Sequence, residues 1–255
     1  MNLLKTIAAA SIIAFASFGA NASQITSGGV TWDPDFDNGF ASDFISNGYY
    51  SQYYVAGTAR GTIEVGDRIT NFADVTLEDT LQGYGYLTDF NAQSPAQYCV
   101  TCEVLTFTFT DFKLEALTGA GAPIFSGGSA AVYADTGGLP TSYASASDDL
   151  LWLDLVPVFN PLAGDGAGST IDVAGTITNG TFANAYFSVV GGLAMSNFDT
   201  NGELFGSDLN YNSVRGGSNA VGSLVLNGNT IPEPTSLAIF GLGLLGLAGA
   251  ARRKA

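Results

Sequence analysis

Three carboxylates alternate along a short acidic segment, at Asp33, Asp35 and Asp37, directly before Asn38 and a glycine. Carboxylate oxygens grouped in a turn are the ligands that a hard cation such as Ca²⁺ prefers. The EF-hand loop requires Gly at its sixth position and Glu at its twelfth, whereas this chain has Asn38 and Phe44 there. We therefore predict either a solvated acidic turn or a calcium site of another kind, and no other cofactor.

Cys99 and Cys102 are the two cysteines of the chain. A disulfide needs Cα atoms within about 7 Å, and extended residues three apart are separated by about 10 Å, so the chain must turn between them. A redox-active pair at this spacing is expected to begin a helix in a βαβ unit, but a strongly β-patterned run follows here. We predict a structural disulfide. The alternatives are a reactive or metal-binding pair, or free or intermolecular thiols.

The chain contains no histidine. This excludes Ser-His-Asp and Cys-His hydrolases and removes the commonest zinc ligand. Asp148, Asp149 and Asp154, near Trp152, could instead form the carboxylate pair of a glycosidase. Such a pair must be separated by about 5–9 Å across a cleft, a distance that the sequence does not show. We predict no catalytic residue, and a glycoside-cleaving enzyme is our third functional hypothesis.

An aromatic-rich segment overlaps and follows the acidic one. Its rings could stack on sugar rings, as in carbohydrate-binding sandwiches, or they could simply fill the core. Core packing is the preferred interpretation. The aromatic residues of this segment are Trp32, Phe36, Phe40, Phe44, Tyr49, Tyr50, Tyr53 and Tyr54.

Strand patterns dominate the chain between its two ends. From Val104 to Thr110 apolar residues and threonines alternate strictly, which is typical of a half-buried strand. The alternation changes phase near Asp111, where we expect a β-bulge, and residues 113–117 could form one short helical turn. Glycine-rich turns separate the candidate strands, so we predict an all-β fold, an antiparallel β-sandwich or jelly roll. The other candidate strands are residues 61–65, 74–81, 130–134, 150–156, 171–178, 185–190 and 221–226.

The N-terminus has the pattern of a secretory signal peptide. Lys5 supplies the positive region, residues 6–19 the apolar region, and Ala20-Asn21-Ala22 a small-residue cleavage site. We predict that residues 1–22 direct Sec export and are removed by signal peptidase. The mature ectodomain would then comprise residues 23–230.

The C-terminal segment, residues 231–255, combines a motif, an apolar stretch and a cluster of positive charge. As a helix rising about 1.5 Å per residue, the uncharged stretch would span roughly 26 Å, slightly less than the ~30 Å hydrocarbon core. The basic residues that follow should remain cytoplasmic. We therefore predict a single transmembrane helix. The three parts are Pro232, Glu233 and Pro234; residues 235–251; and Arg252, Arg253 and Lys254.

This three-part segment resembles the PEP-CTERM sorting signal of Gram-negative bacteria. A plain C-terminal anchor is the alternative. The resemblance implies that an exosortase cuts near residues 232–234, so an intermediate anchored in the inner membrane would precede a cell-surface or extracellular form. It also implies a structural or adhesive protein linked to exopolysaccharide or biofilm. A carbohydrate-binding module, with or without calcium, is the second functional hypothesis.

The predicted ectodomain is strongly acidic. Four basic residues, Arg60, Arg68, Lys113 and Arg215, stand against 22 acidic ones. Binding to nucleic acid requires many Lys and Arg contacts with phosphates. We therefore expect no nucleic-acid partner.

Overall fold

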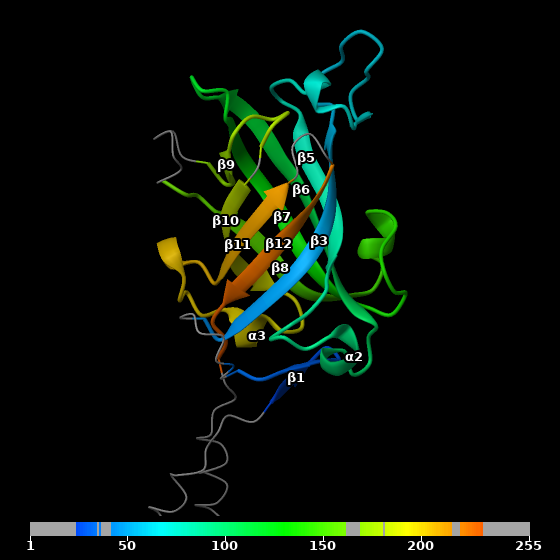
Figure 1. Ribbon diagram of the computed structural model, residues 1–255, viewed down its shortest axis with the longest axis vertical. Helices are drawn as coiled ribbons and strands as arrows, with labels where there is room; N and C mark the ends of the chain where they lie inside the picture. The colour runs from blue at the N-terminus through cyan, green and yellow to red at the C-terminus, as the bar shows by residue number, and fades with distance from the viewer. Residues whose placement is uncertain are drawn as a thin grey trace, which may run out of the picture.

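Eight antiparallel strands, each hydrogen-bonded to the next in chain order, form one sheet that closes on itself (Figure 1). The computed structural model describes residues 24–34, 36, 42–161, 169–180, 182–215 and 220–231. The sheet closes because β12 pairs with both β11 and β3. The strands of this barrel are β3 (Phe44–Val55), β5 (Thr80–Leu87), β6 (Val104–Leu117), β7 (Pro123–Asp135), β8 (Leu150–Val158), β10 (Phe182–Gly191), β11 (Leu209–Arg215) and β12 (Val221–Gly228).

The prediction of an antiparallel, nearly all-β fold is confirmed. The β-sandwich or jelly-roll arrangement is not: one sheet is closed, where the prediction had two sheets packed face to face. Both architectures bury alternate residues of each strand, so their sequence patterns are alike. The two differ in whether the first and last strands pair, and here β3 and β12 do so over eight registered residue pairs.

Several predicted element boundaries are wrong. Residues 61–65 form a turn with an isolated bridge between Arg60 and Ile63, and residues 113–117 continue β6 with no helical turn. The strand predicted at 74–81 begins only at Thr80. The strand predicted at 171–178 is reduced to β9 (Asp172–Ala174). Each of these segments has the apolar pattern on which its assignment was based. Glycine turns and tertiary packing nevertheless determine its local structure.

The bulge predicted near Asp111 is confirmed. Asp111 has φ 61°, and the register between β5 and β6 shifts between the pairs Leu81–Phe112 and Gly83–Phe109. The extra residue at the bulge shifts the alternation of side chains by one position. Apolar side chains before and after the bulge therefore both face the barrel interior. A single strand of 14 residues therefore keeps one continuous apolar face.

Glycines in β5 make room for large rings from β6. Gly83 and Gly85 alternate with outward-facing tyrosines, and each is registered opposite a phenylalanine, Phe109 and Phe107 respectively. A Cβ at Gly85 would lie 2.5 Å from the Phe107 ring, closer than real Cβ contacts allow. Packing thus explains the Gly-Tyr-Gly-Tyr sequence. The glycines face the interior, where the phenylalanine rings of β6 lie over β5, and the tyrosines face outward.

A plug of short elements closes the lower end of the barrel in Figure 1. It consists of the hairpin β1 (Ile25–Ser27) and β2 (Val30–Trp32) together with α2 (Pro95–Tyr98) and α3 (Met195–Phe198). Trp32 is fully buried there, with its ring 5.7 Å from that of Trp152 and 5.2 Å from that of Phe198. This aromatic cluster extends the core beneath the barrel.

The opposite end is covered by chain segments that connect strands. Phe72, in η1 (Phe72–Asp74), packs edge-on against Tyr54 with ring centroids 5.3 Å apart. Within the part of the chain that the structure describes, no helix is long and apolar enough to cross a bilayer. The predicted signal peptide and transmembrane helix lie outside those residues. The remaining short elements are β4 (Arg68–Ile69), η2 (Ala144–Ala146) and η3 (Leu204–Gly206).

Candidate functional site

The interior of the barrel contains an apolar cavity of about 100 Å³. Alternation along the strands directs every second side chain inward, so all eight strands contribute to the lining. Phe107 and Phe112 from β6, Leu155 from β8 and Phe187 from β10 are among the apolar lining residues. An apolar lining of this kind favours a small, largely apolar occupant.

Polar side chains gather at one end of this cavity. Tyr50, Tyr54 and Tyr211 line it together with Ser213. Burial raises the pKa of all three phenols, and the Ser213 side chain beside Tyr50 and Tyr211 partly offsets this effect. The phenols therefore remain protonated at neutral pH and can donate hydrogen bonds.

Arg215 lies at the same end, at the last position of β11. It is buried, with 8% of its surface exposed. Its Nε donates to the carbonyl of Gly180 (3.2 Å) and its Nη2 to the carbonyl of Ile177 (2.7 Å). The guanidinium carbon lies 4.9 Å from the centre of the Phe72 ring. Arg215 thus places a positive charge at the edge of an apolar cavity.

A second hollow lies on the outer wall, over β3, β5 and β12, with a volume of about 630 Å³. We call it the tyrosine groove: it is lined by Tyr49, Tyr84 and Tyr86, with Gly85 and Gly222 also contributing. Tyr49 is 55% exposed, and its ring centroid lies 6.0 Å from that of Tyr86 in a tilted arrangement.

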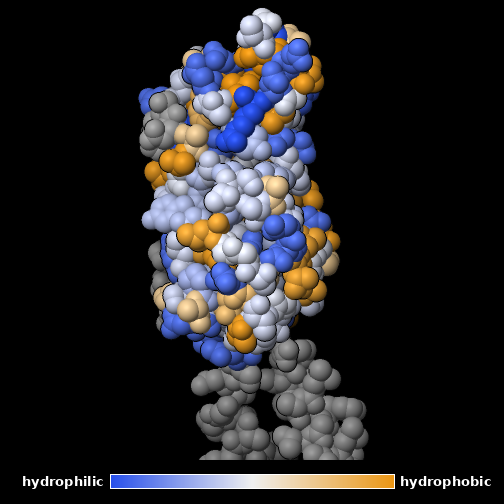
Figure 2. Space-filling model, turned by 90° about the vertical axis from the view of Figure 1, so that its right-hand side faces the viewer, coloured by the Kyte–Doolittle hydropathy of each residue, from blue (hydrophilic) through white to orange (hydrophobic). Residues whose placement is uncertain are grey.

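Polar and apolar residues are mixed over the side wall that Figure 2 shows. Apolar residues form small separate groups there among hydrophilic ones. Such a mixture is usual for a surface in contact with water.

The structure divides the predicted aromatic segment between the two faces of β3. Trp32, Phe44, Tyr50 and Tyr54 are buried, as expected for core packing, whereas Tyr49 faces solvent. Consecutive tyrosines in a strand point to opposite sides, so each Tyr-Tyr pair supplies one interior and one exterior ring. Core packing therefore accounts for the four buried rings, whereas stacking on sugar rings stays a prediction.

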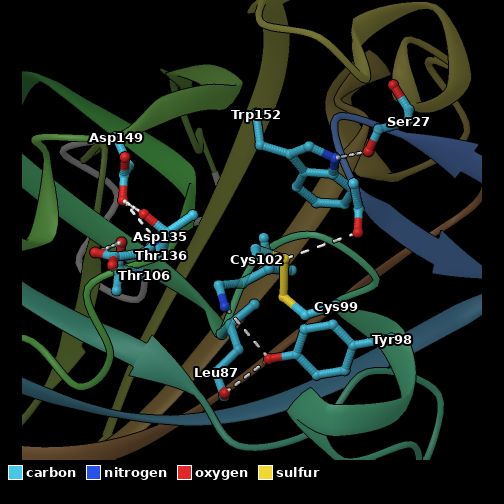
Figure 3. The surroundings of a disulfide bond; sticks show 12 residues. Ser27, Leu87, Tyr98, Cys99, Cys102, Thr106, Asp135, Thr136, Asp149 and Trp152 are labelled. Atoms are coloured by element: carbon cyan, nitrogen blue, oxygen red, sulfur yellow. Dashed lines mark hydrogen bonds between the residues drawn. A yellow bond between two sulfur atoms is a disulfide. The ribbon is translucent and has the colours of Figure 1, made fainter.

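Three carboxylates, Asp135, Asp148 and Asp149, come together just after β7, with one oxygen of each within 4.8 Å of the others. Asp135 accepts from the Gly137 amide (2.5 Å), and Asp149 accepts from the amide and hydroxyl of Thr136 (2.7 and 2.9 Å; Figure 3). Burial raises the pKa of Asp135, and both neighbouring carboxylates add to the increase. These hydrogen bonds stabilise the turn that follows β7. Asp154, proposed from the sequence as a partner, lies in β8 opposite Ala131.

Cys99 and Cys102 are joined by a disulfide, with Cα atoms 4.9 Å apart, at the turn between α2 and β6 (Figure 3). The turn begins with Pro95, and the Gln97 side chain accepts from the Ser94 amide (2.9 Å), a local pattern that starts a helix. The buried Tyr98, directly before Cys99, donates to the Leu87 carbonyl (3.1 Å). This disulfide therefore braces the plug.

The predicted calcium ligands are described only in part. Asp33 follows β2, and its carbonyl accepts from the Asn91 side chain (3.0 Å). Asp35 and Asp37 lie outside the described residues, so the calcium hypothesis stays a prediction. The following predicted residues also lie outside them: Ala20, Ala22, Pro232, Glu233, Pro234, Arg252, Arg253 and Lys254.

Sequence reasoning missed Arg215 as a functional residue. A signal was present: Leu209, Tyr211, Ser213 and Arg215 occupy alternate positions, so the arginine is in phase with inward-facing residues. The strand itself was not recognised because Asn210 and Asn212 have low β-propensity. An arginine at an inward-facing position of a strand, in an ectodomain with only four basic residues, is the signal that would have indicated this site.

Comparison with protein families finds the PEP-CTERM protein-sorting motif at residues 230–254. No curated protein and no solved structure matches the chain. The motif marks an exported protein that exosortase processes and that is anchored in the membrane before release at the surface. The barrel itself is placed in no family by these comparisons.

Proposed function

We propose that this protein is a non-enzymatic component of the bacterial surface, delivered by exosortase, whose barrel binds extracellular polysaccharide through the tyrosine groove. The sorting motif supports the delivery. The observation that carries the binding is the pair of outward-facing rings formed by the exposed Tyr49 and the half-buried Tyr86. The proposal joins the structural or adhesive role inferred from the sequence with its carbohydrate-binding alternative.

The described chain ends next to the sorting motif, at the plugged end of the barrel. The Thr230 amide donates to the Asp43 carboxylate (3.0 Å), and the Ile231 amide donates to the Asn197 carbonyl (2.8 Å). Pro232 follows at once in the sequence. In the anchored intermediate the plugged end therefore faces the membrane, and the side wall with the tyrosine groove is free to meet polymer.

The groove has the features of a shallow site for sugar rings. Tyrosine offers a flat apolar face and a hydroxyl, so it can stack on a pyranose ring and also hydrogen-bond to its substituents. Ser51 and Ser223 also line the groove, and their short side chains rise little above the wall beside the rings. An extended polysaccharide can therefore approach the wall closely over the registered pair Tyr49 and Tyr86.

The described acids support a non-enzymatic role. Asp135 and Asp149 accept hydrogen bonds from backbone amides of their own turn, which is a structural task. Asp208 likewise accepts from the amides of Val189, Thr200 and Asn201 at 2.5–2.7 Å. A glycoside-cleaving enzyme would require a carboxylate pair that flanks a substrate.

Mass spectrometry of the secreted product tests the delivery. Coexpression with an exosortase should shorten the chain near residues 232–234, and a Pro232→Ala, Glu233→Ala, Pro234→Ala triple variant should stay full length. If the wild-type C-terminus is the same with and without exosortase, the tail is a plain anchor and the delivery proposal fails.

Binding of the purified full chain to a glycan array and to the host's exopolysaccharide tests the second part. The Tyr49→Ala, Tyr86→Ala double variant should lose at least about 10-fold in affinity, since each stacked ring contributes on the order of 1 kcal/mol. Tyr133→Ala, on β7 away from the groove, is the matched control and should bind as wild type. Equal binding by the double variant would refute the groove. Loss of binding in a chelator would show that calcium takes part.

A further inference from the structure

The charge on Arg215 has no counter-ion among the described residues. The ion pairs there involve Arg60 and Lys113. Arg215 instead contacts two carbonyl oxygens and the face of Phe72. A buried charge without an opposite charge is costly, so an arginine in this position usually has a partner or a task.

The guanidinium also has donors to spare. It carries five N–H groups, and its hydrogen bonds to described residues use Nε and Nη2. These two bonds fix the plane of the group against the turn at Ile177 and Gly180. A guanidinium held in one orientation, with further donors at the edge of a cavity, is prepared for a planar anion.

The rest of the cavity is suited to hydrocarbon. Phe107, Phe112, Val132 and Leu155 line it, and the polar groups, the Tyr50 phenol and the Ser213 hydroxyl among them, are few. A ligand that fits must therefore be apolar over most of its surface and anionic at one end. Its volume is limited to about 100 Å³.

We propose that the barrel interior binds a small apolar carboxylic acid, with its carboxylate on Arg215 and its hydrocarbon part among the phenylalanines of β6. This site is separate from the tyrosine groove and does not depend on it. A cavity of about 150 Å³ holds one benzene ring. The smaller cavity here therefore suits an acid with a short aliphatic chain, and aromatic acids and long-chain fatty acids should be too large.

A carboxylate fits better than a phosphate. One arginine balances one negative charge, and a phosphate dianion would leave a second charge in an apolar enclosure. The protonated phenols of Tyr50 and Tyr54 can donate additional hydrogen bonds but supply no positive charge. The carboxylate is also planar and can accept two parallel N–H bonds from a guanidinium.

Calorimetric titration of the purified full chain tests the site directly. The probes are butyrate and its neutral isostere butyramide, the larger acids benzoate and palmitate, and inorganic phosphate. We expect butyrate to bind at least about 10-fold more tightly than butyramide, since charge-assisted hydrogen bonds are about twice as strong as neutral ones. Equal binding of butyrate and butyramide, no binding of butyrate, or binding of phosphate alone would overturn the proposal. So would tighter binding of palmitate than of butyrate.

Two variants locate the ligand. Arg215→Gln should weaken butyrate binding at least 10-fold, while Arg68→Gln, which removes an exposed arginine elsewhere, should leave it unchanged. If Arg215→Gln does not fold, Ala185→Val provides the second measurement. It adds volume inside the cavity and leaves Arg215 in place, so it too should weaken binding. Unchanged affinity in a folded variant of either kind would show that the acid binds elsewhere.

Discussion

Individual buried charges in this barrel are stabilised by local partners, as the pair of Asp79 and Arg60 illustrates. Asp79 is completely buried and accepts from Arg60 Nη2 at 2.6 Å and from the amides of Gly57 and Thr76 at 2.9 and 2.8 Å. Arg60 also donates to the Asp74 carbonyl, so one side chain connects both halves of the loop between β3 and β5.

Removing this arginine should destabilise the protein substantially. Arg60→Ala leaves the Asp79 carboxylate buried without an opposite charge, and we expect a loss of about 2–4 kcal/mol in the free energy of unfolding. The control is Arg68→Ala, which removes the same charge where the guanidinium stacks 4.0 Å from the Tyr53 ring, and it should cost about 0.5–1 kcal/mol. Urea unfolding measures both. Similar losses in the two variants would contradict the role given to Asp79.

Asp135 should make the stability depend on pH in the opposite sense to a salt-bridged carboxylate. Because burial raises its pKa in the folded state, the folded protein holds this proton more tightly than the unfolded chain does. Its contribution is therefore fully present below the ordinary carboxyl pKa and is lost as pH rises through the raised value. Asp135→Asn keeps an acceptor for the Gly137 amide and removes the titration.

As pH rises from about 4 to about 7, we expect the free energy of unfolding to fall less for Asp135→Asn than for wild type. Asp111→Asn, an exposed substitution at a position with φ 61° that asparagine tolerates, is the control. Urea unfolding at the two pH values measures the difference. If Asp135→Asn and wild type lose equal stability over this range, the carboxyl titrates alike in the folded and unfolded states.

At the scale of elements, strand β5 depends on glycine. A Cβ at Gly85 would contact the Phe107 ring at 2.5 Å and would also collide with the Tyr49 carbonyl. Gly85→Ala should therefore cost about 1–3 kcal/mol through overpacking. Gly119→Ala, in a turn where a Cβ would meet nothing within 4 Å, should change stability by less than about 0.5 kcal/mol. Thermal unfolding of the two variants checks this, and equal melting temperatures would show that β5 can move away from β6.

The sequence predicted individual elements better than their assembly. The strict alternation in β6 and the phase change at Asp111 defined that strand and its bulge, because both are properties of consecutive residues. Strand β11 escaped detection because it contains Asn210 and Asn212. These two asparagines and Asn184 hydrogen-bond to each other across β10 and β11, so cross-strand contacts offset their poor intrinsic propensity.

Closure of the barrel and the site within it could not be predicted in the same way. Closure depends on pairing between β3 and β12, which lie at opposite ends of the ectodomain sequence. Tyr50, Phe107 and Arg215 meet only because the sheet closes, since they come from three strands that are distant in the chain. Alternation along each strand predicts that each of these side chains points inward. It does not predict which side chains of other strands lie next to it.

At the scale of the whole molecule, the plug and the guanidinium mark opposite ends of the barrel. The described chain ends beside α3, next to the sorting motif, whereas Arg215 lies at the end where β10 begins. A membrane-anchored intermediate would therefore hold its plug toward the bilayer and the charged end of its cavity away from it. The proposed acid site would then lie at the end of the barrel away from the bilayer.

The excess of acidic residues should make the whole fold sensitive to salt. With four basic residues against 22 acidic ones in the predicted ectodomain, self-repulsion opposes the compact state. Salt screens this repulsion, with a Debye length of about 30 Å at 0.01 M and about 10 Å at 0.1 M. Raising NaCl over this range should increase stability by about 1 kcal/mol, which corresponds to about 2–4 °C in Tm for a domain of this size.

Calcium can be separated from screening by the same measurement. At matched ionic strength, CaCl₂ and NaCl should give equal melting temperatures if the ion acts by screening alone, and CaCl₂ should give a higher one if a site binds the ion. Asp33→Asn with Asp35→Asn and Asp37→Asn should abolish that extra increase, whereas Asp135→Asn should abolish it if the cluster after β7 holds the ion. A melting temperature that falls as NaCl is raised would show that attraction between charges, and not repulsion, dominates this acidic barrel.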